Sequence, residues 1–168
     1  MTYTRAATPW KLLSGMVLGV MAIAFFLVDQ AAPSKAASGY EYKEKERCFM
    51  RKINKARKRH ELGKLDRDKQ LGYVGRKHAK SMARSNDIWH DSNLGNKVTR
   101  WRRLGDNVGM GGGCKKVFKA FMDSKAHKDN ILGKWRHFAA GTKCKNGKVF
   151  VEVIFESKRN PDNKYNYP

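Results

Sequence analysis

The chain has 168 residues, which is enough for one domain with a hydrophobic core and too few for two ordinary ones. It contains 36 Lys and Arg residues against 15 Asp and Glu, so its formal net charge is +21. This charge predicts attraction to polyanions such as nucleic acid, anionic lipid or an acidic wall polymer. A solvated Lys-rich surface is the simpler alternative.

The first 36 residues have the pattern of a secretory signal peptide. Arg5 and Lys11 provide a positive start, and a long uncharged apolar run follows. Small residues then lead to candidate cleavage points after Ala32 or Ala36. The apolar run is long for a cleaved signal and slightly short for a spanning helix, so an uncleaved signal anchor in the cytoplasmic membrane is the alternative. In either case we expect the rest of the chain to be secreted or extracellular.

Export changes how the three cysteines are interpreted, because a disulfide persists outside the cell. An odd number leaves at least one cysteine free or joined to another molecule. No two of them have the close spacing of a zinc motif. We expect the pair Cys114–Cys144, because a loop cysteine and a strand cysteine can adjust to each other, although the sequence leaves the pairing open.

Two helices are predicted first, over residues 41–61 and 66–86, because apolar residues recur at the helical period. These residues are Phe49, Ile53, Ala56 and His60 in the first helix, and Leu71, Val74, His78 and Met82 in the second. Asp66 is the expected N-cap of the second helix. Gly72 and Gly75 lower its intrinsic stability, so close packing against a neighbour must hold it.

Residues 87–113 are predicted to be mostly a long loop, which in a compact domain is usually functional. A third helix is predicted over 114–124, with a buried face formed by Val117, Phe118 and Phe121. Two strands, 137–144 and 148–156, are separated by Lys-Asn-Gly, a hairpin signal. Helices early in the chain and a sheet late in the chain predict an α+β fold.

The histidines and tryptophans outside the motifs described below are predicted to be structural. His78 is expected to be a hydrogen-bonded core residue, whereas His60 and His137 are expected at the periphery. The expected packing anchors are Trp89, Trp101 and Trp135.

Five segments occur in an order that resembles one protein family: INKARKRHELGKL, ARSNDIWHDSNL, LGDNVGMGGG, FMDSKAHKDNIL and KVFVEVIFE. The chain is similar to the CAP superfamily, also called SCP, which includes cysteine-rich secretory proteins, antigen 5 and pathogenesis-related 1. The bacterial, actinobacterial-type branch is the most similar. The resemblance implies a three-layer α-β-α sandwich with a central antiparallel sheet. We therefore assign residues 37–45 to a linker, 46–157 to a CAP/SCP domain and 158–168 to a flexible tail.

The resemblance also implies a cleft lined by two histidines and acidic residues. By motif position, the histidines are His90 and His127, and Asn107 matches the family asparagine. Asp106 stands where the family usually has Glu, which withdraws the carboxylate by one C–C bond, about 1.5 Å. A second acidic position of eukaryotic members falls near Ser124, which is not a carboxylate.

Three interpretations of these cleft residues are open: a metal site, a Ser-His-Asp arrangement and a purely structural role. His90, Asp106 and His127 could hold Zn²⁺ with water in the fourth position, and the metal would activate that water. A Ser-His-Asp arrangement could be formed by Ser124, His127 and Asp106, although no nucleophile elbow is present. In the third interpretation these residues are structural: the histidines hydrogen-bond to the loop and turn, and Asn130 ties down the turn that follows His127.

Two functions of different classes follow. The first is a secreted binding module whose cleft takes a lipid, polysaccharide or protein ligand while its basic surface holds it at the anionic envelope. The second is a metal-assisted, peptidase-like hydrolase that uses His90, Asp106 and His127. We favour the binding module, as a monomer with no required cofactor, with an anionic envelope surface, a lipid or a protein as its partner. Specific nucleic-acid binding is not expected, because no recognition motif or stacking platform is present.

Overall fold

The computed structural model describes residues 42–99 and 101–157. The predicted signal segment and the predicted tail lie outside the described residues. The elements are α1 (Glu44–Arg59), β1 (Asp66–Arg67), α2 (Lys69–Ser85), α3 (Leu94–Lys97), β2 (Arg103–Gly111), α4 (Cys114–Asp123), α5 (Lys125–Leu132), β3 (His137–Lys145) and β4 (Lys148–Ser157).

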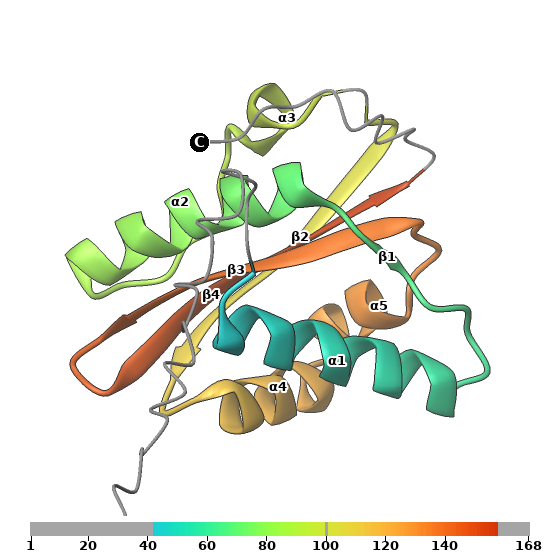
Figure 1. The fold of residues 1–168 in the computed structure, drawn as a ribbon, viewed down its shortest axis with the longest axis horizontal. Helices are drawn as coiled ribbons and strands as arrows, with labels where there is room; N and C mark the ends of the chain where they lie inside the picture. Colours follow the sequence, from blue (N-terminus) through green and yellow to red (C-terminus); the bar gives the residue numbers. More distant parts are fainter. Residues whose placement is uncertain (1–41, 100, 158–168) are drawn as a thin grey trace, which may run out of the picture. The chain divides into compact units, whose positions relative to one another are not determined.

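The strands form one sheet in the order β1-β3-β4-β2. The pairs β3–β4 and β4–β2 are antiparallel, whereas the short β1 runs parallel to β3. Helix α2 covers one face of the sheet, and α1, α4 and α5 lie on the other (Figure 1). The predicted α+β fold and its three layers are confirmed, and the sheet is mixed rather than purely antiparallel because of β1.

Strand β4 lies at the centre of the core, buried from Val149 to Glu156. On one side, Phe150 clusters with Met82 of α2. On the other, Phe155 clusters with Phe49 of α1. A strand that is covered by helices on both faces is apolar on both faces, which explains its nearly continuous hydrophobic sequence.

The predicted hairpin between β3 and β4 is confirmed. Its two turn residues, Asn146 and Gly147, have φ values of 48° and 71°. Both lie in the left-handed region that a two-residue hairpin turn requires, and Asn-Gly is the preferred pair for it. The turn sets the register in which Lys145 pairs with Lys148.

The predicted loop over residues 87–113 is wrong at two places, because it contains the short helix α3 and the whole of strand β2. Strand β2 pairs with β4 along its full length, from Arg103 opposite Ser157 to Gly111 opposite Val149. Its glycines suggested a turn, but pairing with a buried neighbour overrides a low strand propensity. The candidate residues Asp106 and Asn107 are therefore on a strand.

The N-cap prediction for the second helix is also wrong by two residues. Asp68 is the N-cap of α2, and its Oδ1 accepts a hydrogen bond from the Leu71 backbone N–H at 3.0 Å. Asp66 pairs instead with His137 as part of β1. Both aspartates precede an amphipathic run, so the sequence does not distinguish them.

Helix α2 packs unusually closely on β3, as its glycines predicted. A Cβ placed on Gly75 would lie 3.1 Å from the backbone oxygen of Glu152 and 3.2 Å from the backbone nitrogen of Gly141. A Cβ on Gly141 would lie only 1.9 Å from the backbone nitrogen of Arg76. The helix and the strand thus touch backbone to backbone, which only glycine allows at these positions.

A buried carboxylate connects α1, α2 and β3. Glu46 is fully buried and accepts hydrogen bonds from Nε and Nη2 of Arg76 at 2.8 and 2.6 Å. It also accepts from the backbone N–H of Thr142 at 3.1 Å and from that of Lys43 at 2.8 Å. A buried charge with this many donors is compensated, so it fixes the three elements relative to one another.

The disulfide joins Cys48 to Cys114, so the predicted Cys114–Cys144 pair is wrong. The second turn of α1 lies beside the start of α4, with the Cα atoms of the two cysteines 6.3 Å apart. Cys144 is free and exposed near the end of β3. The sequence does not show which helix start lies beside Cys114, because that contact depends on the packing of α4 against α1.

The structure corrects three of the predictions for structural residues. His137 is buried rather than peripheral, with its Nδ1 2.9 Å from Oε2 of Glu156. By contrast, the prediction for Trp135 is confirmed, because it stacks on Phe155 with the ring centroids 5.9 Å apart. Trp89 and Trp101, expected to be anchors, are 40% and 43% exposed. Within residues 42–99 and 101–157, no helix is long and apolar enough to cross a membrane.

Candidate functional site

The best-defined contact in the predicted cleft joins His90 and Asp106. His90 follows α2, and its Nδ1 lies 2.8 Å from Oδ2 of Asp106 on β2. The His90 side chain is 62% exposed and that of Asp106 is 18% exposed. The carboxylate therefore orients an imidazole that remains open to a ligand from solvent.

Two asparagine side chains join β2 to α5 beside this pair. Asn107 is buried, and its Nδ2 donates to the backbone oxygen of His127 at 2.9 Å. Asn130 donates through Nδ2 to the backbone oxygen of Asp106 and to Oδ1 of Asn107, each at 2.9 Å. Successive strand residues point to opposite faces, so Asp106 reaches His90 while Asn107 reaches α5. These bonds hold both candidate histidines beside one strand.

His127 is half-buried on α5, and its ring centroid lies 4.9 Å from that of Phe121. Burial lowers the pKa of His127, the nearby His90 lowers it further, and Asp106 acts in the opposite direction. The imidazole is therefore neutral at pH 7 and presents an unprotonated nitrogen.

Ser124 does not join the histidines. It separates α4 from α5 in an extended conformation, with φ −91° and ψ 123°. Among the described residues, no hydrogen bond links its hydroxyl to His127, and the carboxylate of Asp106 pairs with His90 instead. The structure therefore does not assemble the Ser-His-Asp arrangement considered above.

For the metal-binding hypothesis, the structure brings His90 and Asp106 into contact but does not group three ligands among the described residues. Two imidazoles and a carboxylate are donors that suit Zn²⁺. Within residues 42–99 and 101–157, however, no three His, Cys, Asp or Glu side chains are grouped to hold a metal ion. A zinc site at His90, Asp106 and His127 stays a prediction.

Glu152 is a residue of this region that the motifs do not reveal. Its side chain on β4 is fully buried, and neither of its carboxylate oxygens has a hydrogen-bond partner among the described residues. Burial raises the pKa of Glu152 well above its ordinary value, Asp106 and Asp91 raise it further, and Lys97 opposes them. The sequence feature that could have indicated Glu152 is its position as an acidic residue within a strand that is otherwise apolar.

Replacing Glu152 with Gln tests this burial through the pH dependence of stability. Because the pKa is raised in the folded state, the folded protein binds more protons than the unfolded chain above the ordinary glutamate pKa of about 4.3. Unfolding free energy of the wild type should therefore fall as pH rises from that value, and this contribution is absent in the variant. We expect the stability of the variant relative to wild type to grow between acidic and neutral pH in urea unfolding. A difference that stays constant with pH would contradict the prediction.

Two further contacts hold the segment that carries His90. The Nε2 atom of His78 lies 2.7 Å from the backbone oxygen of Trp89, which confirms His78 as a hydrogen-bonded core residue. Asp91 accepts hydrogen bonds from Lys97 and from the Asn93 backbone N–H. Although burial opposes ionisation of Asp91, these two donors prevail and its pKa is lowered.

Comparison with known proteins identifies the family. The family model described as "CAP: Cysteine-rich secretory protein family" matches residues 50–155. No curated protein sequence gives a significant match. An outer surface protein of Borrelia burgdorferi is similar in structure, with 17% identity over 71% of this chain and 96% of its own, and a TM-score of 0.64.

Two longer bacterial proteins are also similar in structure. An extracellular protein of Bacillus anthracis that contains an SCP domain is 25% identical over 67% of this chain, with a TM-score of 0.56. A cysteine-rich secretory protein of Staphylococcus aureus is 17% identical over 68% of this chain, also with a TM-score of 0.56. The match spans only 41% and 38% of those two proteins. On the match of the family model and the shared fold, the chain belongs to the CAP family of cysteine-rich secretory proteins.

Proposed function

We propose that this CAP-domain protein is an extracellular binding module held at the anionic surface of a cell envelope. The observation that carries the proposal is a basic stripe on α1, formed by Arg51, Lys55, Lys58 and Arg59. All four residues are exposed. At this spacing they share one side of the helix, opposite the side that packs into the core.

The stripe is suited to a surface rather than to a particular protein carboxylate. In the part of the chain that the structure describes, none of its four side chains is in an ion pair. A basic side chain near an anionic membrane contributes about 1 kcal/mol of attraction. The location is supported by the relatives, which include an outer surface protein and an extracellular protein.

Vesicle binding with a charge-matched control tests the proposal. The quadruple variant of the stripe to Gln should bind anionic vesicles more weakly by about 4 kcal/mol, and salt should weaken wild-type binding. The control replaces four exposed basic residues elsewhere, Lys80, Arg84, Lys143 and Lys148, with Gln. Equal loss in both variants would mean that net charge alone acts, and salt-insensitive or absent binding would overturn the proposal.

The alternative function is a metal-assisted hydrolase, favoured by the short contact between His90 and Asp106. Zinc titration by calorimetry, with His90→Ala and His127→Ala beside the wild type, decides between the two. One zinc per chain, lost in both variants and accompanied by a peptidase activity that His127→Ala abolishes, would support the hydrolase. Peptidase activity that survives both substitutions would indicate a contaminant.

A further inference from the structure

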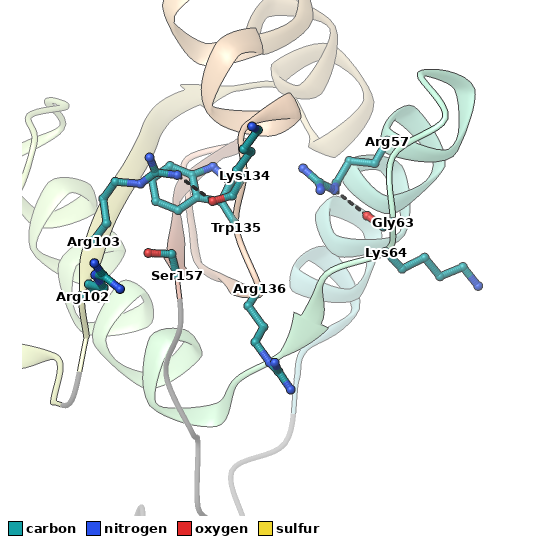
Figure 2. Close-up of a pocket in the computed structure, with 9 residues that line it drawn as sticks. All are labelled: Arg57, Gly63, Lys64, Arg102, Arg103, Lys134, Trp135, Arg136 and Ser157. Carbon is teal, nitrogen blue, oxygen red and sulfur yellow. Dashed lines mark hydrogen bonds between the residues drawn. The ribbon is translucent and has the colours of Figure 1, made fainter.

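An open pocket of about 740 Å³, which His90, Asp106 and His127 do not line, lies where the ends of several elements meet. Figure 2 shows residues from the end of α1, the start of β2, the α5–β3 connection and the end of β4 around it. Its lining residues are Arg57, Gly63, Lys64, Arg102, Arg103, Lys134, Trp135, Arg136 and Ser157. The set is unusual because six of these nine residues are Arg or Lys and none is Asp or Glu.

Arg57 is held in place by the surrounding backbone. Its Nε donates to the carbonyl of Gly63 at 2.9 Å, and its Nη1 donates to the carbonyls of Ile131 and Gly133 at 2.9 and 2.8 Å. The residue is 4% exposed. Carbonyl groups are neutral, so they orient this guanidinium without cancelling its charge.

Arg103 is fixed by an aromatic ring. Its guanidinium lies 4.4 Å from the centre of the Trp135 ring, and its Nη2 donates to the backbone oxygen of Lys134 at 2.6 Å. Trp135 is itself stacked on Phe155 in the core. Two guanidinium groups are thus pre-positioned, which reduces the entropy that a ligand must overcome.

The other cations leave their donors available. The side chains of Arg102, Lys134 and Arg136 are exposed, and none forms an ion pair within the described residues. Lys64 extends away from the other side chains (Figure 2). Like charges gathered around one concavity repel each other, and a bound polyanion would relieve this repulsion.

We propose that this pocket binds a ligand that carries two or more phosphate groups. Guanidinium groups match phosphate oxygens in shape and donate paired hydrogen bonds to them. The volume lies in the range of small-molecule sites, about 300–1,000 Å³, and a single phosphate would leave most of it empty. This site goes beyond the surface attraction of the stripe, because it requires a defined stoichiometry and particular arginines.

Calorimetric titration of inorganic tripolyphosphate into the purified protein tests the site. We expect one ligand per chain in the wild type. In the double variant Arg102→Gln, Arg136→Gln, the dissociation constant should be at least about tenfold larger. Neither side chain has a structural bond in the described residues, so the variant should keep the wild-type melting temperature. The matched control Lys55→Gln, Lys58→Gln removes the same charge from the stripe and should bind tripolyphosphate like the wild type.

The proposal is overturned if tripolyphosphate does not bind or if both double variants weaken it equally. Vesicles that contain cardiolipin, a lipid with two phosphate groups, distinguish the possible sources of the phosphates. If the pocket variant also loses vesicle binding, the ligand is a lipid headgroup, and if it loses only tripolyphosphate, the ligand is a free phosphorylated molecule. If the Lys55→Gln, Lys58→Gln variant alone loses vesicle binding and still binds tripolyphosphate, the pocket and the surface that attaches to the envelope are two different sites.

Discussion

Replacing Gly141 with Ala is expected to destabilise the protein by about 4 kcal/mol or more, which is rare for adding one methyl group. The new Cβ would lie 1.9 Å from the backbone nitrogen of Arg76 and 2.1 Å from the carbonyl carbon of Gly75. No side-chain rotation relieves a clash between two backbones, so α2 must separate from β3. Urea unfolding monitored by circular dichroism measures the loss.

Gly63→Ala is the matched control, because a Cβ at that position would meet nothing within 4 Å and its φ lies outside the left-handed region. It should change the unfolding free energy by less than about 0.5 kcal/mol. If Gly141→Ala were as stable as this control, the close packing of α2 on β3 would be incorrect.

Removing the disulfide with Cys48→Ser and Cys114→Ser should cost about 4 kcal/mol. The bond closes a segment with a sequence separation of 66, so its loss restores considerable conformational freedom to the unfolded chain. It also releases the first turn of α4 from α1. Guanidinium unfolding under oxidising conditions measures the difference, and the two proteins should become similar when the wild type is reduced.

Cys144→Ser distinguishes this connectivity from the Cys114–Cys144 pair expected from sequence. Cys144 is free and exposed, so the single variant should keep the stability of the wild type. A loss in Cys144→Ser comparable to that of the double variant would show that the cysteine pairs in solution.

Sequence patterns predicted the elements whose burial is regular along the chain. The helical period placed α1, α2 and α4, and the Asn-Gly turn defined the β3–β4 hairpin. These signals are local, because they depend on residues a few positions apart. Strand β2 was missed because its glycines become a strand only through pairing with β4, a contact more than forty residues away in sequence, from Gly109 to Val151.

The candidate site shows the same division. The resemblance located His90, Asp106 and Asn107, and the structure joins His90 directly to Asp106. Asn130, expected to tie down the turn after His127, donates to the side chain of Asn107. Glu152 could not be assigned to the site, because its approach to Asp106 depends on the register of β2 against β4. The prediction of the disulfide was wrong for a similar reason, because the packing of the helices decides which cysteines lie close together.

The buried Glu46 has a further consequence for behaviour at high concentration. β1 pairs with only His137 and Phe138, so the rest of the outer side of β3 would be open to a strand from another molecule. The Glu46 carboxylate accepts the Thr142 N–H on that strand, and Asn130 donates to the Asp106 carbonyl on the opposite edge strand. Side chains thus engage hydrogen-bonding groups on both borders of the sheet and oppose its growth into fibrils.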